Sequence, residues 1–172
     1  METGLVVWVE GDRDKRFFEA VIKPRLATAY AQVLVREYRQ RRTADINHLL
    51  RAMSHQGFGR LFIADINSAP CVTSRKEKVK ERYPELEDHE IIVVSREIES
   101  WYLAGLTADG ATALKVTPPP SIDRLTKKDL DRLRPPQFDS ELDFLLELLK
   151  YFDETTACKR NESFGRFHSM LR

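Results

Sequence analysis

The sequence predicts an α/β protein built on a four-stranded parallel sheet flanked by helices, with a helical extension at the C-terminal end. Two observations support this prediction. Short apolar runs alternate with segments of helical periodicity over about the first hundred residues. The runs are apolar throughout rather than at every second position, which is typical of parallel strands that helices cover on both faces.

Four apolar runs are expected to form the strands, at residues 5–9, 31–35, 61–64 and 91–94. The first run, LVVWV, contains three valines, and β-branched residues fit a pleated, buried surface. The later runs LFIA and IIVV have the same character. Each connection is long enough to hold a helix, so the crossovers between parallel strands should be right-handed.

The first two expected helices lie between the first three strands. Residues 13–29 place apolar side chains on one stripe, and Pro24 should kink this helix or end it early. The second helix should begin with Thr43 as its N-cap. We expect Gly57 and Gly59 to end it.

Two further helices are expected after the third and fourth strands. Ser74 and Glu77 have the spacing of a capping box, which should open a helix running to Tyr83. The segment SREIESWYLAG follows the fourth strand and carries Trp101 on an apolar helical face. Gly105 should end this last helix.

The sequence pattern changes after Gly105. We expect residues 1–105 to form the α/β domain and residues 106–172 to form a helical extension packed on it, because so short a segment could hardly bury a core of its own. An amphipathic helix should open at Ser140. Its expected inward side chains are Leu142, Leu145, Leu146, Leu149 and Phe152, and Phe164 and Phe167 should anchor the polar tail.

Composition limits the classes of function. The chain has 172 residues, 42% of them hydrophobic, and a net charge of +1, so the overall charge neither favours nor excludes nucleic acid as a partner. Cys71 and Cys158 fit no metal-site spacing and no disulfide framework. No apolar stretch approaches the ~18 residues that cross a bilayer. We therefore expect no membrane partner and a cytoplasmic location.

Acidic and amide side chains follow three of the four expected strands. They are Glu10 and Asp14 after the first strand, Asp65 and Asn67 after the third, and Glu99 after the fourth. The carboxyl ends of parallel strands meet at one edge of the sheet, so these groups should lie close together. Oxygen ligands suit Mg²⁺ or Mn²⁺. A purely structural role stays open, because acids are also common in the first turns of helices.

Three segments resemble motifs of the Toprim domain, which occurs in topoisomerases, bacterial primases and OLD-family nucleases. VVWVEGDRDKRFF resembles its first motif, a strand that ends in Glu-Gly, and LFIADIN is similar to its second, a strand that ends in Asp-x-Asp. SREIESWYLAG is similar to segments of small bacterial Toprim-like proteins related to the OLD group. The resemblance covers about residues 5–105 and implies a Toprim-like Rossmannoid fold.

The resemblance also implies roles for single residues. Glu10 and Asp65 would be the catalytic pair, with Glu10 binding metal or shuttling a proton and Asp65 ligating the ion. Asp14 and Glu99 would be supporting acids around the same ion. Asn67 stands where the family usually has Asp, which removes one negative charge. This departure leaves open whether a second ion binds and whether the site is catalytic.

Basic side chains are expected near the acids. An acidic metal centre beside basic surfaces suits phosphodiester chemistry, since the metal takes the reacting phosphate and the cations hold its neighbours. On the helix after Asp65, interleaved acids leave a merely solvated surface as the alternative. The candidate nucleic-acid contacts are Arg36, Arg39, Arg41, Arg42, Arg75, Lys76, Lys159 and Arg160.

Together these patterns predict a Mg²⁺-dependent phosphoryl-transfer protein, specifically a nuclease acting on DNA or RNA. The alternatives are a Toprim-like module that binds nucleotides or nucleic acid without chemistry, and an interaction adaptor. The chain has no G-x-x-x-x-G-K-[ST] motif. An ATPase partner of the kind that the OLD resemblance implies would therefore be a separate chain.

Overall fold

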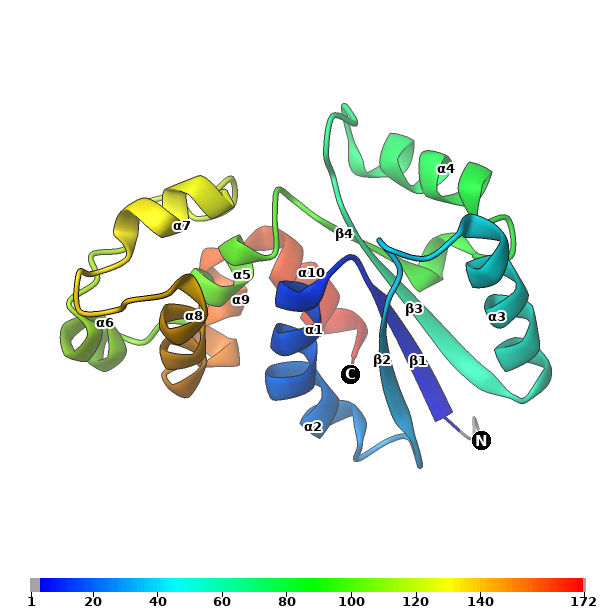
Figure 1. Ribbon diagram of the computed structural model, residues 1–172, viewed down its shortest axis with the longest axis horizontal. Coiled ribbons are helices and arrows are strands. Elements are labelled where there is room, and N and C mark those ends of the chain that lie inside the picture. The colour runs from blue at the N-terminus through cyan, green and yellow to red at the C-terminus, as the bar shows by residue number, and fades with distance from the viewer. Residues whose placement is uncertain (1–3, 172) are drawn as a thin grey trace. The chain divides into compact units, whose positions relative to one another are not determined.

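The computed structural model describes residues 4–171. Its four strands are β1 (Gly4–Val9), β2 (Val33–Glu37), β3 (Phe58–Asp65) and β4 (Ile91–Val94). They form one parallel sheet in the order β2-β1-β3-β4 (Figure 1), which confirms the predicted fold class. Contacts divide the chain into two compact units, one ending at Val93 and the other running from Val94 to Arg172.

β1 is an inner strand of the sheet and is buried along its whole length. It pairs in parallel with β2 from Leu5↔Val33 onward and with β3 through Trp8↔Phe62. β2 begins two residues later than predicted, because the pairing with Leu5 starts at Val33. The carboxyl ends of β1, β2 and β3 therefore lie at the same edge of the sheet.

Helices α3 (Thr43–His55) and α4 (Val72–Arg82) cover one face of the sheet (Figure 1). The side chains beneath these helices form one apolar cluster. This is expected, because successive side chains of a strand point to opposite faces of the sheet and every second one therefore lies under the helices. Its main members are Val6, Trp8, Tyr38, Ile46, Leu50, Phe62, Val79 and Tyr83. Tyr38 stacks on Phe62 with their ring centroids 4.4 Å apart. The residue after β2 is thereby fixed against β3.

The connection from β1 to β2 is a helix in three parts: α1 (Asp12–Phe17), a π-helical turn η1 (Phe18–Ile22) and α2 (Lys23–Leu26). Pro24 lies in the first turn of α2, where its missing N–H is tolerated. The helix ends at Leu26, three residues before the predicted end, in agreement with an early end near Pro24. The irregularity lies just before the proline, in the wider π turn.

Two of the expected helix starts were wrong. Arg42, not Thr43, is the N-cap of α3, and the Thr43 hydroxyl instead accepts a hydrogen bond of 2.9 Å from Arg82 Nε. Cys71 is the N-cap of α4, and its Sγ accepts a hydrogen bond of 3.5 Å from the Ser74 backbone N–H. Ser74 therefore lies inside the helix instead of opening a capping box.

The expected stop at Gly59 was also wrong. Gly57 has φ 77°, a left-handed conformation that glycine adopts without strain, and it turns the chain after α3. Gly59 already belongs to β3, where it pairs with Leu5 of β1. The third strand is therefore longer than the apolar run at 61–64 indicated.

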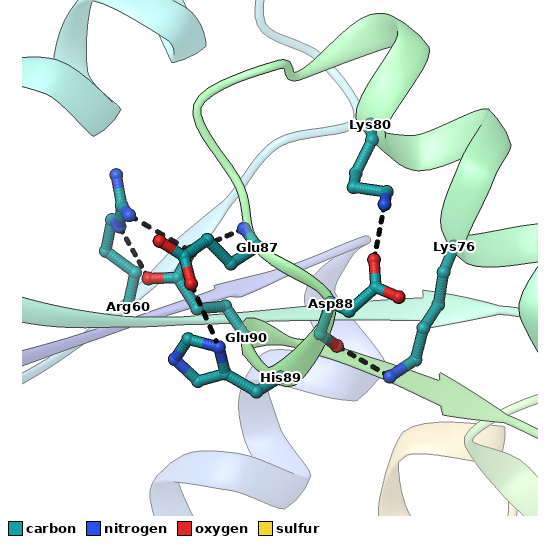
Figure 2. A network of polar contacts seen from close by, with 7 residues as sticks. All are labelled: Arg60, Lys76, Lys80, Glu87, Asp88, His89 and Glu90. Atoms are coloured by element: carbon teal, nitrogen blue, oxygen red, sulfur yellow. Dashed lines mark hydrogen bonds and ion pairs between the residues drawn. The ribbon is translucent and has the colours of Figure 1, made fainter.

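A polar network fixes the 3₁₀ turn η2 (Asp88–Glu90) that precedes β4 (Figure 2). Arg60 of β3 donates two hydrogen bonds to the carboxylate of Glu90, of 2.7 and 3.0 Å. Both side chains are nearly buried, at 12% and 9% exposed. Lys76 Nζ donates to the carbonyl of Asp88 at 2.6 Å, and Lys80 pairs with the Asp88 carboxylate at 2.5 Å. The network ties η2 to both β3 and α4.

The second unit contains six helices among its described residues. They are α5 (Glu99–Ala104), α6 (Ala108–Leu114), α7 (Lys127–Leu133), α8 (Glu141–Lys150), α9 (Glu154–Arg160) and α10 (Glu162–Met170). Trp101 packs between Phe164 and Phe167, with centroid distances of 5.2 and 5.3 Å. The two phenylalanines that were expected to anchor the tail are thus confirmed as core residues.

Part of the predicted α8 stripe was wrong. Leu142 and Leu146 are 40% and 41% exposed, whereas Phe144, Leu145 and Leu148 are buried. The buried stripe is rotated toward Phe144, which packs on Phe138 with the ring centroids 5.3 Å apart. Within residues 4–171, no helix is long and apolar enough to cross a membrane.

Candidate functional site

The strand order creates a switch point between β1 and β3. The chain passes from β2 on one side of β1 to β3 on the other side. In open α/β sheets, ligands bind outside the carboxyl ends of the strands where the order reverses in this way. Glu10 directly follows β1, and Asp65 is the last residue of β3. Both predicted catalytic acids therefore lie at the switch point.

Tyr38 spans this point from the end of β2. Its backbone N–H donates to the carbonyl of Val9 at 2.9 Å, and its hydroxyl donates to the carbonyl of Ile63 at 3.0 Å. The side chain thus crosses the end of β1 to reach β3. The hydroxyl proton is committed to this hydrogen bond, so Tyr38 holds the strand ends in place.

The acids act together on the hydroxyl of Tyr38. Burial raises the pKa of this hydroxyl, and the negative charges of Glu10, Asp14 and Asp65 raise it further. The guanidinium of Arg75 acts in the opposite direction. Tyr38 consequently stays protonated near neutral pH. Glu10, Asp14 and Asp65 thus all act on the same hydroxyl, and their convergence on one ion stays a prediction.

Glu10 has an unsatisfied buried oxygen. Its side chain is 24% exposed, yet Oε2 is shielded from solvent and has no hydrogen-bond partner among residues 4–171. Oε1 lies 4.0 Å from Nη1 of Arg39. Buried polar atoms normally have a partner, so Oε2 of Glu10 marks a position where a ligand could bind.

Asp14 and Asn67 have clear local roles. Asp14 is 8% exposed and accepts a hydrogen bond of 3.3 Å from the Gly11 N–H, which closes the turn between β1 and α1. Asn67 has φ 52°, a left-handed conformation that Asn and Asp adopt more readily than most residues. The turn that follows β3 therefore accounts for an Asx residue at 67 without reference to a metal.

Glu99 lies in the second unit, at the start of α5, and is 4% exposed. Its approach to Glu10 and Asp65 stays a prediction. In the part of the chain that the structure describes, no three His, Cys, Asp or Glu side chains are grouped as ligands of one metal ion. Any ion at the switch point would therefore rely on one or two carboxylates.

The arginines after β2 differ in their contacts. Arg42 binds Asp45 through two hydrogen bonds of 3.0 Å each, and this pairing lowers the pKa of the Asp45 carboxyl. Arg41 Nε donates to the Glu37 carbonyl at 3.1 Å, which leaves its terminal nitrogens. Arg36 is paired with β1 through its backbone, but its side chain has no hydrogen-bond or ion-pair partner within the described chain. Arg36 and Arg41 are thus better placed than Arg42 to meet an anion.

The other predicted basic contacts mostly bind their own unit. Arg75 Nε donates to the carbonyl of Asp65 at 2.6 Å, so its side chain lies at the switch point. Lys76 is engaged by η2 (Figure 2). In the second unit Arg160 Nη1 donates to the carbonyl of Leu106 at 2.9 Å, and Lys159 is exposed. Their contact with nucleic acid stays a prediction.

Sequence reasoning missed two contributors to this edge of the sheet. Tyr38 lies beside Glu10 because residue 38 is the next step after the pair Val9↔Glu37, a register that the sequence alone does not reveal. Lys15 of α1 pairs with Glu37 at 3.5 Å, a contact that no local pattern indicates.

No protein-family model matches this chain, and searches of curated proteins and of solved structures also found no match. Function must therefore be inferred from the site itself. The Toprim resemblance stays a prediction.

Proposed function

We propose that the chain is a Toprim-like, Mg²⁺-dependent phosphoryl-transfer protein, specifically a nuclease acting on DNA or RNA. The observation that carries the proposal is the buried Oε2 of Glu10, which has no hydrogen-bond partner in the described chain and lies at the switch point with Asp65. A buried carboxylate oxygen without a partner is unfavourable. A bound cation would remove this penalty, so the geometry fits a cation ligand.

The donor set fits Mg²⁺ by its chemistry. Glu10 and Asp65 would hold the ion, and the side-chain carbonyl of Asn67 is available on the turn after β3. Mg²⁺ commonly uses one or two carboxylates and takes its remaining ligands from waters and substrate phosphates. The lack of a three-carboxylate cluster in the described residues is compatible with that habit.

When bound, the ion would polarise a phosphate and lower the pKa of an attacking water. The residues of the chain would supply position and charge. Arg39, whose side chain is 74% exposed, can turn from Glu10 toward a phosphate oxygen. Arg75 holds the end of β3 through the Asp65 carbonyl, and Tyr38 holds β3 through Ile63. Glu10 would hold the ion or accept a proton from water, the two roles that the resemblance implies for it.

Cleavage assays test this proposal. Single-stranded and double-stranded DNA and RNA are incubated with the full chain and Mg²⁺ or Mn²⁺. We expect metal-dependent cleavage that Asp65→Ala and Glu10→Gln abolish. Asp12→Asn is the matched control, because Asp12 belongs to α1 but is 66% exposed and pairs with Arg16. Cleavage that survives Asp65→Ala would exclude this site.

Metal binding gives a second test that does not need a substrate. Mg²⁺ or Mn²⁺ should raise the melting temperature of the parent, because binding to the folded state alone stabilises it by mass action. Glu10→Gln should remove the increase, and Asp12→Asn should retain it. An equal increase in Glu10→Gln and the parent would place the ion elsewhere.

A binding module without chemistry is the second candidate, and Asn67 favours it. The amide supplies no negative charge where the resemblance expects one. Asn67→Asp keeps a side chain that tolerates φ 52°. If the protein is a nuclease, this variant should bind metal more tightly or cleave faster. If it only binds nucleic acid, Asn67→Asp should cleave nothing, as should the parent. An adaptor would show neither cleavage nor salt-dependent binding, and a separate ATPase chain remains a proposed partner.

A further inference from the structure

A hollow of about 350 Å³ lies beside β2, one of the two outer strands of the sheet. Its volume falls at the lower end of the range for small-molecule pockets, roughly 300–1,000 Å³. Residues from α1, from β2 and from the turn after β2 form its walls. They are Lys15, Val35, Arg36, Glu37, Gln40 and Arg41.

The walls of the hollow are mainly cationic. Three of the six lining residues are cationic and one is acidic, so two positive charges are in excess. Glu37 holds the Lys15 ammonium at 3.5 Å, and its backbone carbonyl holds Nε of Arg41. These contacts fix the direction of Lys15 and Arg41. They leave the guanidinium of Arg36 and the terminal nitrogens of Arg41 as donors for an anion.

The rest of the lining suits a group with both polar and apolar parts. Val35 is 7% exposed and forms an apolar wall, while Gln40 adds an amide that can donate or accept. Guanidinium groups pair with two phosphate oxygens at once. The hollow thus has the donors for a phosphoryl group and an apolar surface for the sugar beside it.

The hollow lies one turn of chain from the switch point. The Arg39 N–H donates to the Glu10 carbonyl at 3.2 Å, and the Arg41 N–H donates back to the Tyr38 carbonyl at 3.0 Å. The two residues from Arg39 to Arg41 span at most about 7 Å. Phosphates on one strand of a duplex follow each other every ~3.4 Å along the axis. Both lengths are short, so a phosphate that neighbours one held at Glu10 is the candidate ligand of the hollow.

We propose that this hollow binds a phosphoryl group of the substrate strand that neighbours the reacting phosphate; its role as a substrate site rests on the proposed nuclease function. The group is either a terminal phosphate monoester or an internal phosphodiester. Both have the same anionic oxygens. The monoester carries about two negative charges at neutral pH, which matches the excess positive charge of the walls.

Binding is measured with the full chain in EDTA, so that the metal site does not contribute. The probes are short single-stranded oligonucleotides with and without a terminal phosphate, and inorganic phosphate as competitor. Arg36→Ala and Arg41→Ala should each weaken binding about tenfold, as expected for one lost charge-assisted contact. Each substitution should also make the plot of log binding constant against log salt concentration shallower, by about 0.7 in the magnitude of its slope. Inorganic phosphate should displace the oligonucleotide from the parent, but not from the variant that carries both Arg36→Ala and Arg41→Ala.

Arg51→Ala and Lys78→Ala are the matched controls. Both residues are exposed cations of the first unit, on α3 and α4 and outside the hollow, so binding should stay within about twofold of the parent. Equal losses in Arg36→Ala and Arg51→Ala would overturn the proposal. If Arg41→Ala lowers the melting temperature, Arg36→Glu replaces it as the second variant and should weaken binding more than Arg36→Ala.

The two phosphate sources give different results. If the hollow takes the terminal monoester, the advantage of the phosphorylated strand should disappear in Arg36→Ala. If the hollow takes an internal diester, both oligonucleotides should bind the parent with equal affinity. Arg36→Ala should then weaken the binding of both by the same factor. Binding through Arg36 and Arg41 without any cleavage would contradict the nuclease and leave the hollow as an anion site. A third result would contradict only the proposed role of the hollow. In it, Asp65→Ala abolishes cleavage, and both arginine variants bind the oligonucleotides as tightly as the parent does.

Discussion

Four carboxylates of the second unit differ from Glu10 of the first unit in how their oxygens are used. In the second unit, four carboxylates accept hydrogen bonds from backbone N–H groups at helix starts: Glu97 from Lys127, Asp123 from Glu162, Asp129 from Thr126 and Asp153 from Thr156. In the first unit, Glu10 follows a buried strand, and its Oε2 has no hydrogen-bond partner within residues 4–171. The first kind of carboxylate stabilises a helix, whereas the second remains available to a ligand.

This difference separates acids that sequence patterns alone cannot separate. Asp14 shows the overlap, since it closes the turn at Gly11 and also acts on the Tyr38 hydroxyl. Glu90, in the same unit as Glu10, is fully engaged by Arg60 and the Glu87 N–H (Figure 2). A buried carboxylate oxygen without a hydrogen-bond partner in the described chain, such as Oε2 of Glu10, therefore marks a candidate ligand more clearly than the position of an acid after a strand.

The largest expected effect on the free energy of unfolding concerns Glu90, the carboxylate of the first unit that Arg60 holds. Arg60→Met should lower the free energy of unfolding by about 3 kcal/mol at neutral pH, because it leaves the Glu90 charge nearly buried without its cation. Urea denaturation measures this change. Lys80→Met is the control, since Lys80 pairs with an exposed Asp88 and should lose less than about 1 kcal/mol. Similar losses in both variants would refute the distinction.

A somewhat smaller loss is expected in the second unit. Asn161 is fully buried, accepts from the Ser163 hydroxyl and the Phe164 N–H, and donates to the Ser100 hydroxyl. Asn161→Ala should lower the free energy of unfolding by about 2 kcal/mol, because it leaves buried groups unpaired. Asn47→Ala removes one hydrogen bond to the Arg82 carbonyl and should lower the free energy of unfolding by a smaller amount. Unaltered unfolding of Asn161→Ala would contradict the structural role of this network.

Glu10→Gln sharpens the contrast because its expected effect on stability is small. In the absence of divalent metal, the variant should change the free energy of unfolding by less than about 0.5 kcal/mol, or increase it, since it removes a charge that repels Asp14 and Asp65. Denaturation in EDTA measures this. A loss as large as that of Asn161→Ala would show that Glu10 is a structural residue.

The smallest effect is confined to acid. Hydrogen bonds from Thr156 lower the pKa of Asp153. A carboxyl with a lowered pKa contributes stability above its ordinary value of about 3.9, and this contribution disappears as the pH falls through the lower, folded value. Asp153→Asn keeps an N-cap side chain but does not titrate. Parent and variant should therefore differ by a constant amount from pH 7 to about pH 5 and change relative to each other only below about pH 4.

The four strands could be predicted from the sequence, because the apolar runs and the acids after them are local features, but the starts of β2 and β3 could not. The parallel sheet and the position of Glu10 and Asp65 at its carboxyl edge follow from these runs alone. Contacts between distant segments could not be predicted. Arg60 reaches Glu90 thirty residues later, and Tyr38 reaches Ile63 across β1. The prediction of helix N-caps also failed where the capping side chain is an unusual one, as with Cys71 of α4.

The outer position of β2 has a consequence for solubility. An edge strand presents backbone groups that can pair with a strand of another copy, and charged side chains hinder such pairing. β2 ends in Arg36-Glu37, with Lys15 beside it. Replacing this pair by Val and Thr would leave an uncharged edge. The charges at the end of β2 therefore disfavour edge-to-edge pairing between copies of the chain.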